Sequence, residues 1–214
     1  MKRVLPCARA PSGSVLAVVV IALIGAACGT NPGEPTPVPG TCLGRAVFGP
    51  AAQSAYVLPY PVGTTYEVLQ SYCLAAGSHG NQLAYDFLMR EGTPVTAARA
   101  GVVVALVDRW EDTDWDGTHF NYVYILHEDG SAAFYAHLQL RSLLVRIGDQ
   151  VSAGQQIGSS GHCGTPIADL HFGVYRAWPP TDGNDLPVSF RNAAGPLDSR
   201  GGLQAGVVYT ALPY

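Results

Sequence analysis

The sequence predicts an all-β fold, a small antiparallel sheet or sandwich, on the basis of two observations. From residue 65 onward, short apolar runs follow one another and are separated by glycine, proline or aspartate, as at 92–94 and 129–130. No segment of this region carries a sustained helical period. Several short strands separated by turn residues are typical of an all-β domain.

The individual strands follow from this pattern. Each is a run of apolar residues that ends at turn residues. The expected ranges are 65–71, 83–88, 95–99, 102–107, 122–127 and 131–138, followed by shorter glycine-punctuated strands, a strand at 169–172 and an edge strand at 207–209. Asp129-Gly130 predicts a hairpin with a type I′ turn, because that turn needs residues that accept positive φ.

Length and charge limit the functional classes. The chain has 214 residues, of which 48% are hydrophobic, enough for one core and one domain of catalytic size. The net charge is −4, and the 12 lysine and arginine residues form no basic stripe of the kind that binds nucleic acid. We therefore expect no nucleic-acid partner.

Residues 1–27 have the composition of an export signal. Basic residues precede the apolar run 15–24, which is long enough for a signal-peptide core but shorter than the roughly 20 residues that span a bilayer. Small residues then precede Cys28, a pattern that resembles the lipobox of bacterial lipoproteins. We expect an exported protein of the cell envelope, anchored to a membrane by lipid at Cys28. Ordinary signal cleavage, which would leave a secreted or periplasmic protein, is the alternative.

The rest of the chain is predicted to form one domain between two flanking segments. Residues 28–41 are rich in proline and glycine and predict a semi-extended linker. The folded domain is expected over 42–178. Residues 179–214 form a C-terminal extension to which the sequence assigns no function.

Removal of the signal, which contains Cys7, leaves four cysteines, and Cys42, Cys73 and Cys163 remain if Cys28 carries lipid. In an exported protein they are expected to form one disulfide and leave one free thiol. A Cys73–Cys163 bridge would tie together the two walls of a cleft, and it is slightly preferred. A Cys42–Cys73 bridge, which would anchor the N-terminal arm, is nearly as plausible.

Three side chains have the chemistry of metal ligands. His79 and Asp86 flank the start of an apolar run, and His171 lies far downstream. Two imidazoles and a carboxylate are the ligand set of an open zinc site. Because alternate residues of a strand share a face, Asp169 and His171 are expected to face one cleft.

Five segments in this order resemble the lysostaphin/LytM-type zinc metallopeptidases, which cut peptidoglycan cross-links. The segments are SHGNQLAYDF, GTPVTAARAGVV, FYAHL, IGDQVSAGQQIGSSG and DLHF, and the resemblance covers residues 57 to 176. It implies a LytM-type β-domain with long loops around a cleft. It also implies Zn²⁺ held by His79, Asp86 and His171, with His137 assisting at the transition state. A metal-activated water would then hydrolyse a peptide bond of peptidoglycan.

Asp169 departs from the family pattern, which has a histidine there in His-Leu-His-Phe. A free Asp169 carboxylate could act as a general base. As a fourth ligand it would close the site, and a third possibility is that catalysis has been lost. The prediction is a zinc metalloendopeptidase with His137 and Asp169 as catalytic residues. The alternative is a catalytically degenerate LytM-like domain that binds the cell wall or activates another hydrolase.

Overall fold

A computed structural model of the chain describes residues 38, 40–74, 77 and 79–214. The predicted export signal, the predicted lipid site at Cys28 and most of the predicted linker lie outside these residues. Within the described ranges, no helix combines the length and the apolar content needed to cross a membrane.

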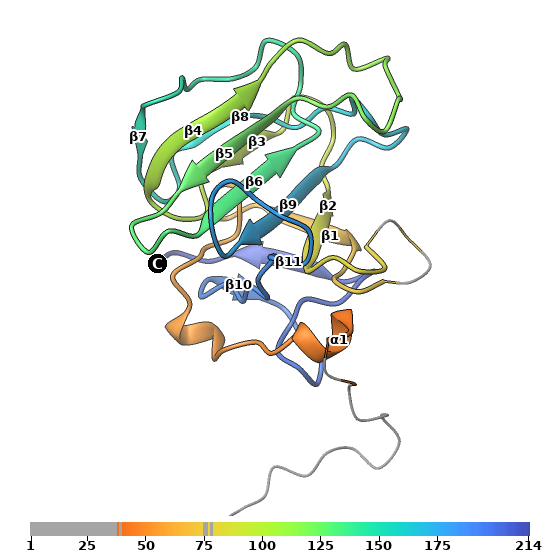
Figure 1. Cartoon of the computed structure of the whole chain (residues 1–214), viewed down its shortest axis with the longest axis vertical. Helices are drawn as coiled ribbons and strands as arrows, with labels where there is room; N and C mark the ends of the chain where they lie inside the picture. Colours follow the sequence, from red (N-terminus) through yellow and green to blue (C-terminus); the bar gives the residue numbers. More distant parts are fainter. Residues whose placement is uncertain (1–37, 39, 75–76, 78) are drawn as a thin grey trace, which may run out of the picture. The chain divides into compact units, whose positions relative to one another are not determined.

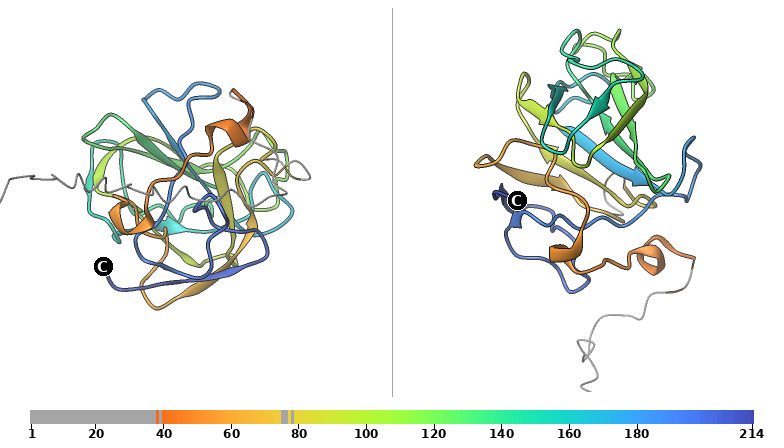
Figure 2. Two further views of the ribbon diagram at one scale, coloured as in Figure 1. Left: turned by 90° about the horizontal axis from the view of Figure 1, so that it is seen from below. Right: turned by 90° about the vertical axis from the view of Figure 1, so that its left-hand side faces the viewer.

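Antiparallel strands dominate the described part of the chain, where nine form one sheet and two form a second (Figure 1). The strand order of the large sheet is β10-β11-β1-β2-β9-β6-β5-β4-β7, and β3 pairs with β8. The bounds are β1 Thr65–Gln70, β2 Ala84–Leu88, β3 Pro94–Thr96, β4 Gly101–Val107, β5 Tyr122–Leu126, β6 Ala132–Ala136, β7 Gln150–Val151, β8 Gln156–Ser159, β9 Leu170–Tyr175, β10 Ala193–Ala194 and β11 Val208–Ala211. The turned views show that the large sheet is strongly twisted (Figure 2). The predicted all-β fold is confirmed.

The C-terminal segment contributes to this sheet and to its core. β11 pairs with β1, and β10 pairs with the other side of β11, so the predicted strand at 207–209 is present but does not form the edge. Phe190 and Tyr209 are buried, and the Phe190 ring lies 5.6 Å from that of Phe172 on β9. The predicted extension 179–214 therefore shares one core with the predicted domain 42–178.

The β5–β6 hairpin is present, but its turn is not type I′. Gly130 has a φ of 82°, whereas Asp129 is not among the residues with positive φ. His127 N donates to Ser131 O at 2.8 Å, so the loop has three residues, in which a left-handed glycine follows a type I turn. The Asp129 carboxylate accepts a hydrogen bond from Ser131 Oγ at 2.6 Å and pairs with Arg99 at 2.6 Å. These contacts hold Asp129 in a conformation that a type I′ turn does not use.

The N-terminal arm carries a short helix, α1 (Cys42–Arg45), and a 3-10 turn at Ala51–Gln53. A disulfide joins Cys42 to Cys73, and Cys163 is free and buried. The preferred Cys73–Cys163 pairing is therefore wrong. The Cys163 thiol points into the interior, where its Sγ accepts a hydrogen bond from Asn121 N at 3.1 Å.

Candidate metal centre

Two of the predicted ligands lie on paired strands. Asp86 on β2 and His171 on β9 are direct partners in the antiparallel register. The next pair along, Tyr85 and Phe172, faces the core, so the polar pair faces the opposite side of the sheet. Asp86 Oδ1 lies 2.8 Å from His171 Nδ1.

The third predicted ligand comes from the turn before β2. His79 is fully buried, and its Nε2 lies 3.2 Å from both Asp86 Oδ1 and His171 Nδ1. On the other side of the ring, Nδ1 donates to the Ser71 carbonyl oxygen at 3.3 Å. That bond leaves Nε2 as the nitrogen with a free lone pair, the arrangement that a metal-binding histidine needs.

These three side chains fit a zinc ion in type and spacing. Their candidate ligand atoms all lie within 4.8 Å of one another. Zinc takes nitrogen and oxygen ligands at about 2.0–2.2 Å, which separates neighbouring ligand atoms of a tetrahedral site by about 3.3 Å. The structure thus brings the three residues together as predicted, and zinc binding itself stays a prediction.

The electrostatics also favour a metal. Burial alone would raise the pKa of the Asp86 carboxyl, but the adjacent His171 and His79 rings outweigh burial and hold the pKa below its usual range. Asp86 is therefore ionised, as a carboxylate metal ligand must be. Gln70 Nε2 donates to its second oxygen, Oδ2, at 2.7 Å and orients the carboxylate.

His137 follows the last residue of β6 and lies beside this cluster. Its φ is 60°, and its ring centroid lies 6.2 Å from that of His171. Burial lowers the pKa of the imidazole. Nδ1 donates to the Cys163 carbonyl oxygen at 2.8 Å, so the neutral ring presents Nε2 as an acceptor.

A buried asparagine organises the loops behind His137. Asn121 has no exposed surface, and its Oδ1 accepts hydrogen bonds from the backbone N of Arg109 at 2.8 Å and Trp110 at 2.9 Å. Its Nδ2 donates to the carbonyl oxygens of Trp110 and Leu138. Its own backbone N–H binds the thiol of Cys163. Asn121 could not be recognised from the sequence because its partners lie in three separate loops.

Asp169 is buried immediately before β9 and is not one of the clustered ligands. Its backbone N donates to Gly161 O at 3.3 Å, and among the described residues no side chain hydrogen-bonds its carboxyl group. Burial, followed by the nearby Asp86 carboxylate, raises the pKa of Asp169 to about 8. A dication bound at the cluster would lower the pKa of Asp169.

An open cleft of about 900 Å³ is lined by Asp86, His171, His137 and Asp169, and His79 is fully buried beside Asp86 and His171. One wall is aromatic and was not predicted. Tyr124 stacks on Phe134 at 4.4 Å and contacts Trp178 at 4.7 Å, and Phe134 lies 5.7 Å from His171. No lysine or arginine is among the described lining residues. The alternation of Tyr122 and Tyr124 on one strand was the available signal for a shared face.

His162, in the segment between β8 and β9, is not part of the cluster. Its Nδ1 is 3.7 Å from Glu91 Oε2, and it is not in the group of ligand atoms. Nothing in this geometry gives it a place in the metal centre.

Comparison with known proteins identifies the family. The sequence profile described as Peptidase family M23 matches residues 80–184. The uncharacterized lipoprotein YgeR of Escherichia coli K12 is 31% identical over 140 residues, which cover 65% of this chain and 50% of YgeR. Peptidoglycan DD-endopeptidase ShyC of Vibrio cholerae is 39% identical over 79 residues, which cover 37% of this chain and 16% of ShyC. The chain thus spans no more than half the length of either relative.

Among solved structures, the catalytic domain of lysostaphin from Staphylococcus simulans is 27% identical, with a TM-score of 0.41. The match covers 57% of this chain and 86% of that domain. The family match begins one residue after His79 and includes Asp86, His137, Asp169 and His171. This chain belongs to peptidase family M23, the lysostaphin/LytM-type family.

Proposed function

We propose that this protein is a zinc metalloendopeptidase of the cell envelope that hydrolyses peptide cross-links of peptidoglycan. The observation that carries the proposal is the convergence of His79, Asp86 and His171, two of which line one open cleft. Three protein ligands leave a fourth position open, as catalytic zinc sites require. The relative ShyC, named as a peptidoglycan DD-endopeptidase, supports the substrate class.

The proposed metal site uses three residues that would hold the ion and two that orient them. His79 Nε2, His171 Nδ1 and Asp86 Oδ1 would hold Zn²⁺, and Ser71 and Gln70 orient two of these ligands. When bound, Zn²⁺ supplies an activated water and polarises a carbonyl group of the substrate.

The proposed catalytic residues are His137 and Asp169. The neutral His137 ring is fixed through its Nδ1 and presents Nε2 to the cleft, where it can take up a proton or, once protonated, donate to an oxyanion. An ionised Asp169 carboxylate can accept a proton in the same cleft.

The proposed location is the cell envelope. YgeR is named as a lipoprotein, which supports lipid attachment at Cys28, and the apolar run 15–24 supports export. A Cys28→Ser form of the full chain should lose its association with bacterial membranes if this is right.

Asp169 also supports a second candidate function, a degenerate domain that binds the wall or activates another hydrolase. Zinc analysis of the purified protein beside a peptidoglycan digestion assay separates the two. The endopeptidase should hold about one zinc per chain and release peptides, and Asp86→Ala should abolish both. Zinc without peptide release would favour the degenerate domain. Normal folding without any zinc affinity would reject the metal site.

A further inference from the structure

His79 is held differently from the other two proposed ligands. Asp86 and His171 lie on strands whose backbones hydrogen-bond to each other. His79 lies in a turn between β1 and β2, outside the sheet. Apart from the hydrogen bond between its ring and Ser71 O, the position of His79 depends on the contacts that hold the backbone of residues 79–83.

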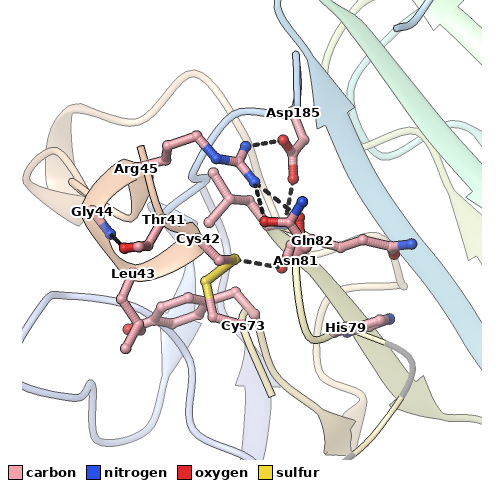
Figure 3. Close-up of a disulfide and its surroundings, with 12 residues drawn as sticks. Thr41, Cys42, Leu43, Gly44, Arg45, Cys73, His79, Asn81, Gln82 and Asp185 are labelled. Carbon is pink, nitrogen blue, oxygen red and sulfur yellow. Dashed lines mark hydrogen bonds and ion pairs between the residues drawn. A yellow bond between two sulfur atoms is a disulfide. The ribbon is translucent and has the colours of Figure 1, made fainter. Parts of the chain in front are cut away.

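The backbone of the residues that follow His79 forms hydrogen bonds with side chains that are distant in the sequence (Figure 3). Arg45 of α1 donates through Nη2 to the Asn81 carbonyl oxygen at 2.8 Å. Asp185 accepts a hydrogen bond from Leu83 N at 2.6 Å and forms an ion pair with the same Arg45. The exposed fractions of these two side chains, 22% and 11%, show that the ion pair is largely shielded from solvent.

A covalent bond fixes α1 next to this turn. Cys42, the first residue of α1, is joined to Cys73, and Cys42 Sγ lies 3.6 Å from the Gln82 carbonyl oxygen. Cys73 N donates to that same oxygen at 2.9 Å, and Gln82 N donates back to His79 O at 3.1 Å. Cys73 has a φ of 54°, a left-handed conformation that L-residues rarely keep without support. The disulfide and Gln82 supply that support.

We propose that the Cys42–Cys73 disulfide, together with the Arg45–Asp185 pair, is a latch that positions His79, so that the metal affinity of the site depends on thiol oxidation. The proposal rests on the zinc site proposed above. Forming the bond removes two protons and two electrons from two thiols, and a disulfide of an exchange partner accepts them and becomes two thiols. The ligand set would then be completed in an oxidising compartment and left incomplete in a reducing one.

The decisive measurement is the zinc dissociation constant of the full chain, oxidised and reduced, by competition with a chromophoric chelator. A phosphine reductant, which takes up oxygen from water as the disulfide becomes two thiols, is removed before the titration. Reduction should weaken zinc binding by at least about tenfold, the usual cost of losing an outer partner of a ligand. An unchanged dissociation constant after reduction would overturn the latch.

The second test leaves the disulfide intact. Asp185→Asn and Arg45→Met should each weaken zinc binding in the oxidised protein. Arg99→Met breaks another arginine–aspartate pair, Arg99 with Asp129, and should leave the zinc affinity unchanged. An unchanged zinc affinity in Asp185→Asn and Arg45→Met, or an equal effect of Arg99→Met, would overturn the latch.

Hydrogen exchange separates failure of the latch from failure of the zinc site. The amides of residues 79–83 should exchange faster after reduction, while those of β5 and β6 stay protected. Faster exchange in a protein that binds no zinc in either state would keep the positioning role and reject the metal. Unchanged exchange, or exchange that rises throughout the chain, would reject the positioning role itself.

Discussion

Asp86 and His171 are cross-strand partners in the β2–β9 pairing, and their side chains meet at 2.8 Å. A shift of this register by one residue would turn one of the two side chains to the opposite face of the sheet. The flanking pairs Tyr85–Phe172 and Phe87–Leu170 are buried in the core and resist such a shift. Packing on one face thus fixes the geometry of the two ligands on the other.

The first prediction follows from this pairing. His171→Ala should reduce the zinc content from about one per chain to near zero, because two remaining ligands make a weak site. Metal analysis after dialysis against buffer with trace zinc would measure it. His162→Ala is the matched control and should keep its zinc, since His162 lies outside the cluster. Equal zinc contents in the two variants would contradict the assignment.

The second prediction concerns the aromatic wall of the cleft. Trp178 contacts Tyr124 at 4.7 Å, lines the cleft and is not one of the clustered residues. Trp178→Ala should therefore raise KM for peptidoglycan fragments about fivefold, which corresponds to about 1 kcal/mol of lost contact, with kcat little changed. Steady-state kinetics would separate the two constants.

A second tryptophan provides the control for this change. Trp115 is 61% exposed and is not part of the cleft lining, so Trp115→Ala should leave both constants unchanged. A fall in kcat with constant KM for Trp178→Ala would instead indicate that the wall acts on the transition state.

Much of the fold and of the metal cluster could be predicted from the sequence because both depend on local alternation. Asp86 and His171 each lie between two apolar residues of a predicted strand, and this alternation is visible in the sequence. His79 could be predicted as a candidate ligand from its residue type and its place before an apolar run. Its approach to the other two residues could not be predicted, because it depends on the turn that α1 and Asp185 hold.

The errors concern contacts between residues that are distant in the sequence. The sequence could not choose between Cys73–Cys163 and Cys42–Cys73, since the choice depends on where the N-terminal arm folds back. The turn type of the β5–β6 hairpin was missed because Arg99, 30 residues away, binds Asp129. Tertiary contacts decided both features.

The third prediction concerns the stability of the fold against acid. His127 is 3% exposed, its Nδ1 donates to Ala100 O at 2.8 Å, and its Nε2 is buried without a partner among the described residues. Burial lowers the pKa of this imidazole from its ordinary value of 6.5, and the nearby Arg99 lowers it further. Below pH 6.5 the unfolded chain therefore binds more protons at this site than the folded protein does.

The direction of the pH effect on stability follows from the linkage between proton binding and folding. The free energy of unfolding should fall as the pH drops from 7 through 6.5 toward the lowered pKa of His127. His127→Gln, which cannot take up a proton, should show a shallower fall over the same range. Urea unfolding at a series of pH values would measure both curves. Parallel curves would show that His127 does not carry the effect.

The last prediction concerns Asp169, the position at which this chain departs from its family. Asp169→Asn keeps the size of the side chain but cannot take up a proton, and Asp169 is not among the clustered ligands. We expect this variant to keep its zinc while peptide release from purified peptidoglycan falls by about a hundredfold or more, the range for loss of a general base. Loss of zinc in Asp169→Asn would instead make Asp169 a fourth ligand.

Asp169→His, which restores the family's histidine, completes the test of Asp169. Activity found only in Asp169→His would show that the natural protein is a non-catalytic member of the family. Activity in the natural form that falls in Asp169→Asn, while the zinc content stays constant, would show that the aspartate has taken over a catalytic role.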